Sequence, residues 1–224
     1  MIESKLRKED VRLADLVSSF LDTHFYSEKT SNFTRIEDRV HQVQGLDVIF
    51  DLNNEHYDCD EKNGGTRINT NLRTFSLELS FINRGGFRNV GWFLNPDLKN
   101  NSYMLIWPDK ADTDKPQTVD EIREVEIALV KKDKLKKYLE EHGITISKLQ
   151  NITNAIINRT PEAETLRKRD KYGNIIQSYD GKLKYEIGGL TFCHSTQLVE
   201  SPVNLILPRE VYREIADYNT IIYA

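Results

Sequence analysis

Four charged side chains stand within three short apolar runs of residues 45–81, and their types suit hydrolysis of a phosphodiester bond. Asp47 heads the first run, Asp60 and Lys62 close the second, and Glu78 interrupts the third. Such hydrolysis needs a nucleophilic water, relief of charge on the phosphate and protonation of the leaving oxygen. A divalent ion supplies the first two, and Mg²⁺ binds hard oxygen ligands such as two carboxylates and a carbonyl.

Strand geometry is expected to bring three of these side chains together. The run at 46–50 predicts a short strand, and 56–62 predicts its returning partner in a hairpin. Because side chains alternate between the two faces of a strand, Lys62 shares a face with Asp60. The hairpin order places Asp47 near Asp60. A lysine beside two metal-binding acids can stabilise the charged phosphate or help to deprotonate the water.

These residues resemble the PD-(D/E)xK nuclease superfamily, which has the restriction-endonuclease-like fold. Asp47 matches the family's first acid at the start of a strand, while Asp60 and Lys62 match the (D/E)xK motif on the next strand. The resemblance covers roughly residues 35–107. It implies that Asp47 and Asp60 hold Mg²⁺, with Mn²⁺ able to substitute, and that Lys62 orients the attacking water or stabilises the pentavalent phosphate.

The resemblance also suggests auxiliary residues, which are assigned by their order along the chain. Glu37, on the segment before the first strand, is the candidate for a further metal ligand. Glu78, on the strand that follows, is the candidate for a further catalytic group. Arg67 and Arg73 come soon after Lys62 and are the candidates for contact with a nucleic-acid phosphate.

The pattern of apolar residues predicts an α/β or α+β fold, with a mixed β-sheet flanked by helices. Spacings of three and four residues predict an amphipathic helix over 3–26, and a second helix is expected over 33–44. A third strand is expected at 74–81, and a central strand at 103–107 that ends at Pro108. The remaining predicted strands are 90–94, 122–130, a hairpin over 172–187 around Asp180-Gly181, 190–195 and 201–207, and the remaining helices are 131–143, 145–158 and 208–216.

The length of 224 residues fits one domain. We expect a nuclease-like core at about 33–142, preceded by the N-terminal helix and followed by a C-terminal α/β extension at about 143–224. Two cysteines are too few for a disulfide framework or a thiolate zinc site. No apolar run approaches the roughly 20 residues of a membrane span, and the charged N-terminus has no secretory hydrophobic region. A cytoplasmic location without membrane contact is therefore expected.

The net charge of −4 argues mildly against a nucleic-acid coat protein, but a nuclease needs only a local basic rim. The leading interpretation is therefore a Mg²⁺-dependent endonuclease whose partner is a nucleic acid, with DNA favoured. Cleavage of both strands of a duplex would favour a homodimer. The first alternative is a catalytically silent restriction-endonuclease-like module that binds DNA or a protein partner. The second is an unrelated α/β protein in which Asp47 caps a turn and Asp60 and Lys62 form an exposed edge-strand pair.

Overall fold

The computed structural model describes residues 5–63, 68–176 and 182–224. It divides into two compact units that alternate along the chain. The first unit comprises Met1–Arg73, Leu98–Lys134 and Arg209–Ala224, and the second comprises Thr74–Asp97 and Leu135–Pro208. The chain therefore enters the second unit twice, whereas the sequence suggested one division near residue 142. Both units combine a sheet with helices, so the predicted α/β class is confirmed.

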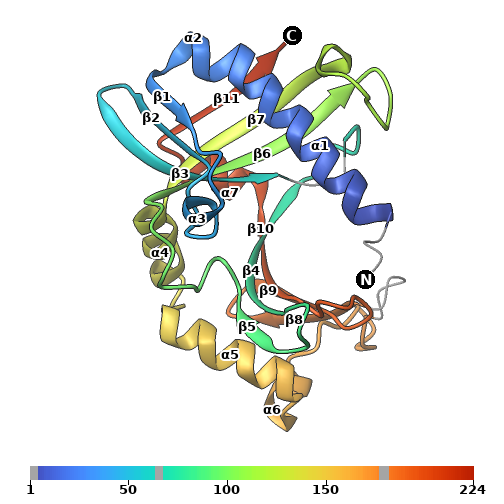
Figure 1. The fold of residues 1–224 in the computed structure, drawn as a ribbon. Coiled ribbons are helices and arrows are strands. Elements are labelled where there is room, and N and C mark those ends of the chain that lie inside the picture. Colours follow the sequence, from blue (N-terminus) through green and yellow to red (C-terminus); the bar gives the residue numbers. More distant parts are fainter. Residues whose placement is uncertain (1–4, 64–67, 177–181) are drawn as a thin grey trace. The chain divides into compact units, whose positions relative to one another are not determined.

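The first unit is built on a six-stranded mixed sheet (Figure 1). Its strands in spatial order are β1 Ser31–Arg35, β2 Val48–Leu52, β3 Glu55–Asn63, β6 Ser102–Ala111, β7 Ile122–Lys131 and β11 Tyr218–Tyr223. The β3–β6 pair is parallel and the other pairs are antiparallel. The predicted end at Pro108 is wrong, because β6 continues to Ala111 and accommodates the proline with a shift of register against β7.

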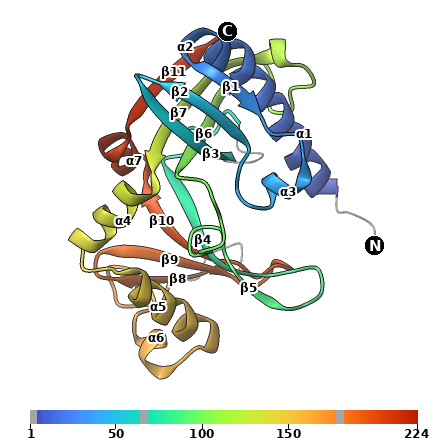
Figure 2. The same ribbon diagram turned by 60° about the vertical axis from the view of Figure 1, so that its left-hand side comes forward.

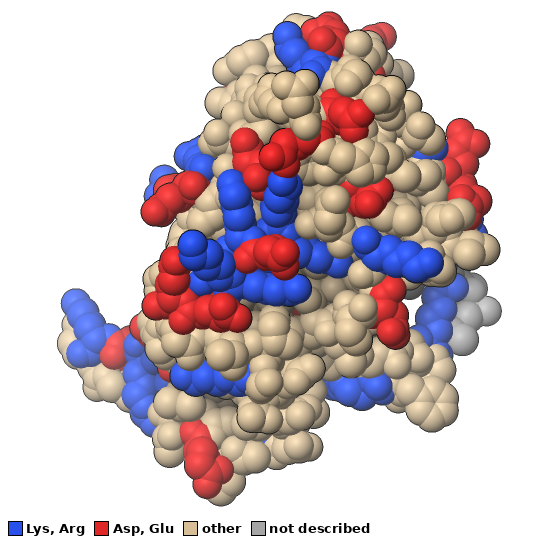
Figure 3. All heavy atoms as spheres, turned by 90° about the vertical axis from the view of Figure 1, so that its left-hand side faces the viewer, with Lys and Arg blue, Asp and Glu red and all other residues tan. Residues whose placement is uncertain are grey.

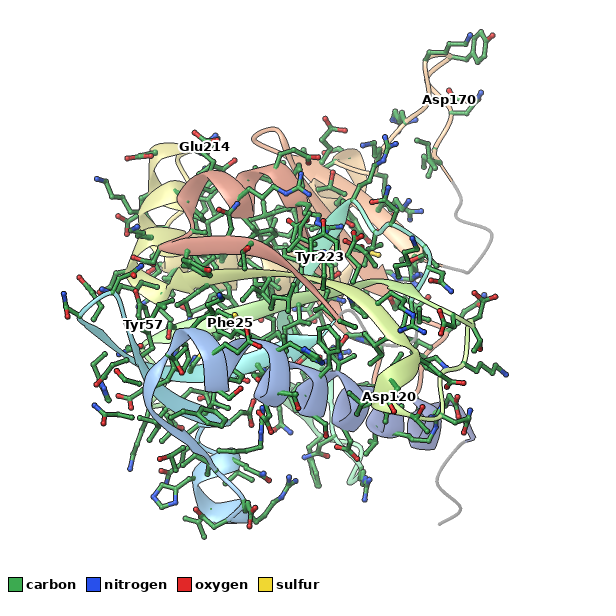
Figure 4. All side chains as sticks on the ribbon, turned by 90° about the horizontal axis from the view of Figure 1, so that it is seen from above. Phe25, Tyr57, Asp120, Asp170, Glu214 and Tyr223 are labelled. Carbon is green, nitrogen blue, oxygen red and sulfur yellow. The ribbon has the colours of Figure 1, made fainter. Side chains whose placement is uncertain are left out.

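A long helix covers one face of this sheet. Helix α1 (Lys5–Leu21) continues into the π-helical turn η1 (Asp22–Tyr26) and α2 (Ser27–Lys29), and the 3₁₀ turn η2 (Val119–Glu121) lies against α1. The predicted apolar stripe of α1 and η1 faces the sheet: its buried members are Leu13, Val17, Phe20, Leu21 and Phe25, and Leu16 is partly buried. Phe25 packs edge-on against Phe50 of β2, with ring centroids 6.4 Å apart (Figure 4). The helix thereby fixes which face of β2 and β3 is the core.

The helix predicted over 33–44 is wrong. Its first part forms β1, in which Thr34 pairs with Ile49 at the edge of the sheet. Phe33 stacks on Tyr26, with ring centroids 4.6 Å apart, so the aromatic residue favours the strand through tertiary packing. Only α3 (Arg39–Gln42) is helical, and the side chain of Asp38 caps its N-terminus.

The predicted hairpin of β2 and β3 is confirmed. Asn53 and Asn54 form its turn with φ angles of 54° and 65°, the left-handed geometry that two-residue hairpin turns require. On the sheet face away from α1, helix α7 (Arg209–Ile215) packs against β7. Arg209 is buried there and forms ion pairs with Asp109 and Glu126.

The second unit contains a five-stranded antiparallel sheet in the order β5-β4-β10-β9-β8 (Figure 2). Leu77, Phe192 and Leu205 lie in its buried face, and α5 contacts β4 and β10. The bounds of its elements are β4 Thr74–Ile82, β5 Arg88–Val90, α5 Ile146–Asn158, α6 Pro161–Thr165, β8 Lys182–Ile187, β9 Leu190–Ser195 and β10 Val203–Pro208, while α4 (Lys132–Glu141) begins in the first unit.

Several predicted elements of this unit change their boundaries or partners. The strand expected at 90–94 is reduced to β5, and Pro208 ends β10 instead of opening a helix. Asp180-Gly181 lies outside the described residues. Strand β8 pairs with β9, across a turn at Gly188 and Gly189 whose φ angles are 60° and 78°. Asp170 lies at a turn of a segment that extends outward (Figure 4), where its carboxylate accepts hydrogen bonds from two backbone N–H groups.

Candidate functional site

Asp47 is held directly in front of β2 by hydrogen bonds to both neighbouring segments. Its backbone N–H donates to Cys59 O at 3.0 Å, and its carbonyl accepts from Ile36 N at 2.8 Å. Its side-chain Oδ2 accepts from the backbone N–H of Glu61 at 2.9 Å. These contacts fix the position of the Asp47 carboxylate against the middle of the aspartate–glutamate–lysine motif on β3.

Gly45 allows the chain to approach this position closely. Its φ of 78° lies in the left-handed region, and a Cβ added there would come within 2.9 Å of Asn100 Oδ1. The carbonyl of the adjacent Gln44 accepts a hydrogen bond from Lys99 N at 2.8 Å. The segment that precedes β6 therefore supports the start of β2, and a larger residue at Gly45 would strain its backbone and push the Asn100 side chain aside.

The structure brings Asp47, Asp60 and Lys62 together, as the hairpin geometry predicts. Asp60 is 2% exposed, and its Oδ1 lies 2.5 Å from Lys62 Nζ. The other carboxylate oxygen, Oδ2, is buried without a hydrogen-bond partner. A buried carboxylate oxygen without a donor is costly for the fold, so this atom indicates a position for a cation or another donor.

The electrostatics of the two acids support the same interpretation. Burial and then the negative charge of Asp60 raise the pKa of Asp47 from 3.8 to about 6, although Lys62 opposes that shift. Two carboxylates facing one lysine leave excess negative charge, which a divalent cation would neutralise. Among the described residues, no group of three or more His, Cys, Asp or Glu side chains is placed to hold a metal ion, so the fit rests on this pair. Mg²⁺ commonly binds through one or two carboxylates and retains several waters.

Glu61 points to the opposite face of β3, as the alternation predicts. Its carboxylate accepts hydrogen bonds from Ser18 Oγ at 3.0 Å and Tyr26 OH at 2.8 Å, and it forms an ion pair with Arg35 at 2.8 Å. Arg35 also forms an ion pair with Asp22 at 2.5 Å. Glu61 therefore anchors β3 to the α1 layer, and this anchor fixes the face on which Asp60 and Lys62 lie.

Sequence reasoning missed two residues on the Asp60 face. Tyr103 of β6 is the register partner of Asp60 in the parallel pair and is 1% exposed. Burial, followed by the charge of Asp60, raises the pKa of its hydroxyl. Lys132, the first residue of α4, places Nζ 5.5 Å from the centroid of the Tyr103 ring. Tyr103 and Lys132 lie near Asp60 because β3 pairs in parallel with β6. No local sequence motif indicates this proximity.

The other predicted site residues belong to other segments of the chain. Glu37 is exposed between β1 and α3, next to Ile36, and within the described part of the chain its carboxylate forms no hydrogen bond or ion pair. Glu78 belongs to β4, so the expected third strand forms in the sheet of the second unit instead of beside β3. Arg73 is exposed at the end of the first unit's first segment, before Thr74, and Arg67 lies outside the described residues.

No family model, no curated protein and no solved structure matches this chain. None of the helices in residues 5–63, 68–176 and 182–224 is long and apolar enough to cross a membrane. Acidic and basic side chains are interspersed on the face drawn in Figure 3. The functional interpretation therefore depends on the geometry of Asp47, Asp60 and Lys62.

Proposed function

We propose that this protein is a divalent-metal-dependent nuclease that hydrolyses phosphodiester bonds, with DNA as the favoured substrate. The observation that carries the proposal is that Asp47, directly before β2, lies close to Asp60 of the antiparallel strand β3, where Lys62 contacts Asp60. The resemblance to the PD-(D/E)xK superfamily assigns the same three residues to the reaction. The buried, unpartnered Oδ2 of Asp60 supports it independently of that resemblance.

Each residue has a distinct role in the proposed reaction. Asp47 and Asp60 would hold Mg²⁺ or Mn²⁺, and the bound ion would lower the pKa of a water and act as a Lewis acid toward the phosphate. Lys62, fixed against Asp60, orients the attacking water and offsets the negative charge that develops on the phosphate oxygens. Lys132 provides a second positive charge on the Tyr103 side of the site, suited to an adjacent phosphate.

Cleavage assays with single-stranded DNA, duplex DNA and RNA, each with Mg²⁺ or Mn²⁺, test the proposal. We expect Asp60→Asn and Lys62→Gln each to lower cleavage at least about 100-fold, because each removes a group that acts on the reacting atoms. Asp58→Asn is the matched control. Asp58 lies two residues earlier on the same face of β3, where its carboxylate is paired with His56.

The control should cleave like the parent protein. Equal losses in Asp58→Asn and Asp60→Asn would show that general disturbance of β3 causes the effect, and would remove the support for a metal site. A folded parent protein that cleaves none of the three substrates and binds no Mg²⁺ would support the catalytically silent module instead. The cytoplasmic location and the homodimer stay predictions.

A further inference from the structure

The second unit contains a buried histidine whose hydrogen bonds are incomplete. His194 of β9 is 5% exposed and lies on the same strand face as Phe192. Its Nε2 is 2.9 Å from Ser201 Oγ, and its Nδ1 is buried without a hydrogen-bond partner. A proton on Nε2 fits this arrangement, because the other tautomer would leave a buried N–H group without an acceptor.

This tautomer determines what the serine hydroxyl can do. When His194 donates from Nε2 to Ser201 Oγ, the hydroxyl proton of Ser201 remains available for a further acceptor. Ser201 is partly exposed and has a φ of 39°, a backbone conformation that serine rarely adopts. The hydroxyl is thus a donor on a partly exposed residue, and the buried ring of His194 holds its oxygen in place.

Arg88 meets Ser201 from the neighbouring edge of the sheet. Its Nη1 donates to Ser201 O at 2.9 Å. Arg88 is partly buried, and burial lowers the pKa of its guanidinium. Within the described residues, no carboxylate forms an ion pair with Arg88. The carbonyl of Ser201 offsets only part of the cost of desolvating this guanidinium, and a bound anion would offset the rest.

Arg159 adds a second guanidinium at the end of α5. It occupies the left-handed C-cap of that helix, with a φ of 48°, and its side chain is exposed. After burial, the charges of Arg88 and then Arg159 lower the pKa of His194 to about 4, so both guanidiniums act on the same ring. In the described part of the chain, Arg159 also has no carboxylate partner. Hydrogen bonds to Ser201 join the Arg88 guanidinium and the Ser201 hydroxyl through the same residue, and the exposed charge of Arg159 adds to their positive potential.

We propose that Arg88, Arg159 and the Ser201 hydroxyl, supported by His194, form a binding site for a phosphate group. Guanidinium groups match phosphate oxygens with paired N–H donors, and a hydroxyl donor completes the set. The site lies in a different unit from Asp47 and Asp60 and does not depend on the metal-dependent cleavage proposed for them. A nucleic-acid phosphodiester and free inorganic phosphate share this chemistry, and binding experiments separate them.

Titration of the full-length protein followed by NMR of the histidine ring C–H signals tests the site. The chain has five histidines, and His194→Gln identifies the signal of His194. Inorganic phosphate is added in one series and a short single-stranded oligodeoxynucleotide in another, both in EDTA to prevent cleavage. We expect phosphate to shift the His194 signal and to raise the pKa of its ring, because a bound anion offsets the two guanidiniums.

Two variants and one control make the result specific. Arg88→Gln keeps a donor for Ser201 O, and Arg159→Asn suits the left-handed backbone, so both remove charge with little disturbance of the fold. Each should weaken phosphate binding about tenfold, the loss expected for one charge-assisted hydrogen bond. Arg169→Gln is the control, since Arg169 is exposed and also donates to a backbone carbonyl, that of Gly173, at 2.8 Å.

The response of the His194 signal to the two ligands distinguishes the possible occupants of the site. Shifts with both ligands support a nucleic-acid phosphate, and shifts with inorganic phosphate alone support a small free phosphate. An unchanged His194 signal with both ligands overturns the proposal, as does equal weakening in the Arg169→Gln control. Asp60→Asn should bind both ligands here as the parent does, so failure of the proposed nuclease would be recognised separately.

Discussion

The carboxylate of Asp47 accepts a hydrogen bond from the backbone N–H of Glu61, the residue between Asp60 and Lys62, at 2.9 Å. This single contact ties the start of β2 to the middle of the motif on β3. The side chain of Glu61 points to the other face and is anchored to Arg35 and Tyr26. The backbone hydrogen bond to Asp47 and the anchoring of Glu61 therefore fix the positions of the two acids before any ligand binds. Such preorganisation favours precise binding.

A divalent ion should stabilise the protein through this pair. Binding to the folded state alone adds about 2.7 kcal/mol to the free energy of unfolding at a concentration 100 times the Kd. We expect Mn²⁺ to raise the Tm of the parent protein and of Asp58→Asn, and to leave the Tm of Asp60→Asn unchanged. Thermal unfolding with and without EDTA measures this. An equal rise in Asp60→Asn would place the ion elsewhere.

Adjacent lysines offer a test of the second phosphate contact. Lys132 lies over Tyr103 on the Asp60 face, whereas Lys131 forms an ion pair with Glu55 and lies over Tyr57. We expect Lys132→Gln to lower cleavage about tenfold, the effect of one charge-assisted contact, and to reduce the salt dependence of substrate binding. Lys131→Gln should change neither quantity appreciably. Equal effects of the two variants would mean that general charge, and not position, matters.

The pKa of Asp47 predicts how stability depends on pH. The folded pKa of about 6 exceeds the unfolded value of 3.8, so protonation of Asp47 favours the folded state. Its contribution is therefore present below pH 3.8 and is lost as pH rises to about 6. Asp47→Asn should be more stable than the parent above pH 6, by at most about 3 kcal/mol, and should lose this advantage near pH 4. Urea unfolding in EDTA at several pH values measures the difference.

Asp51 provides the control with the opposite sign. Hydrogen bonds from Asn32 and then His56 lower the pKa of Asp51, so its ionised form favours the folded state. Asp51→Asn should therefore lower stability at neutral pH, although its partner His56 is exposed and the effect should be small. If Asp47→Asn were less stable than the parent at pH 8, the cost of burying the Asp47 charge beside Asp60 would not be the dominant effect at the site.

The sequence predicts the central hairpin and its three site residues because these depend on local rules. Alternation along β3 and the adjacent asparagines at 53 and 54 suffice to place Lys62 beside Asp60 and Asp47 near both. The sequence also indicates that Glu78 lies on a strand, but it does not indicate which sheet that strand joins. The choice between two sheets depends on packing of the whole chain.

The positions of Tyr103 and Lys132 also depend on packing of the whole chain, so the sequence does not predict them. They approach Asp60 only because β6 returns parallel to β3 after the chain has passed through the second unit. For the segment 33–44, the sequence pattern predicts the wrong type of element. Its periodicity suggests a helix, but pairing with β2 and stacking of Phe33 on Tyr26 stabilise a strand in its first part.

Glu61 should matter for stability more than its position inside the motif suggests. Its side chain is 7% exposed and receives hydrogen bonds from Ser18, Tyr26 and Arg35. Glu61→Gln keeps the shape but removes the charge that Arg35 faces, so we expect a loss of about 2 kcal/mol in the free energy of unfolding. Glu55→Gln, at an exposed ion pair on the same strand, should cost at most about 0.5 kcal/mol. Urea unfolding compares the two variants, and equal losses would show that Glu61 does not anchor β3 to α1.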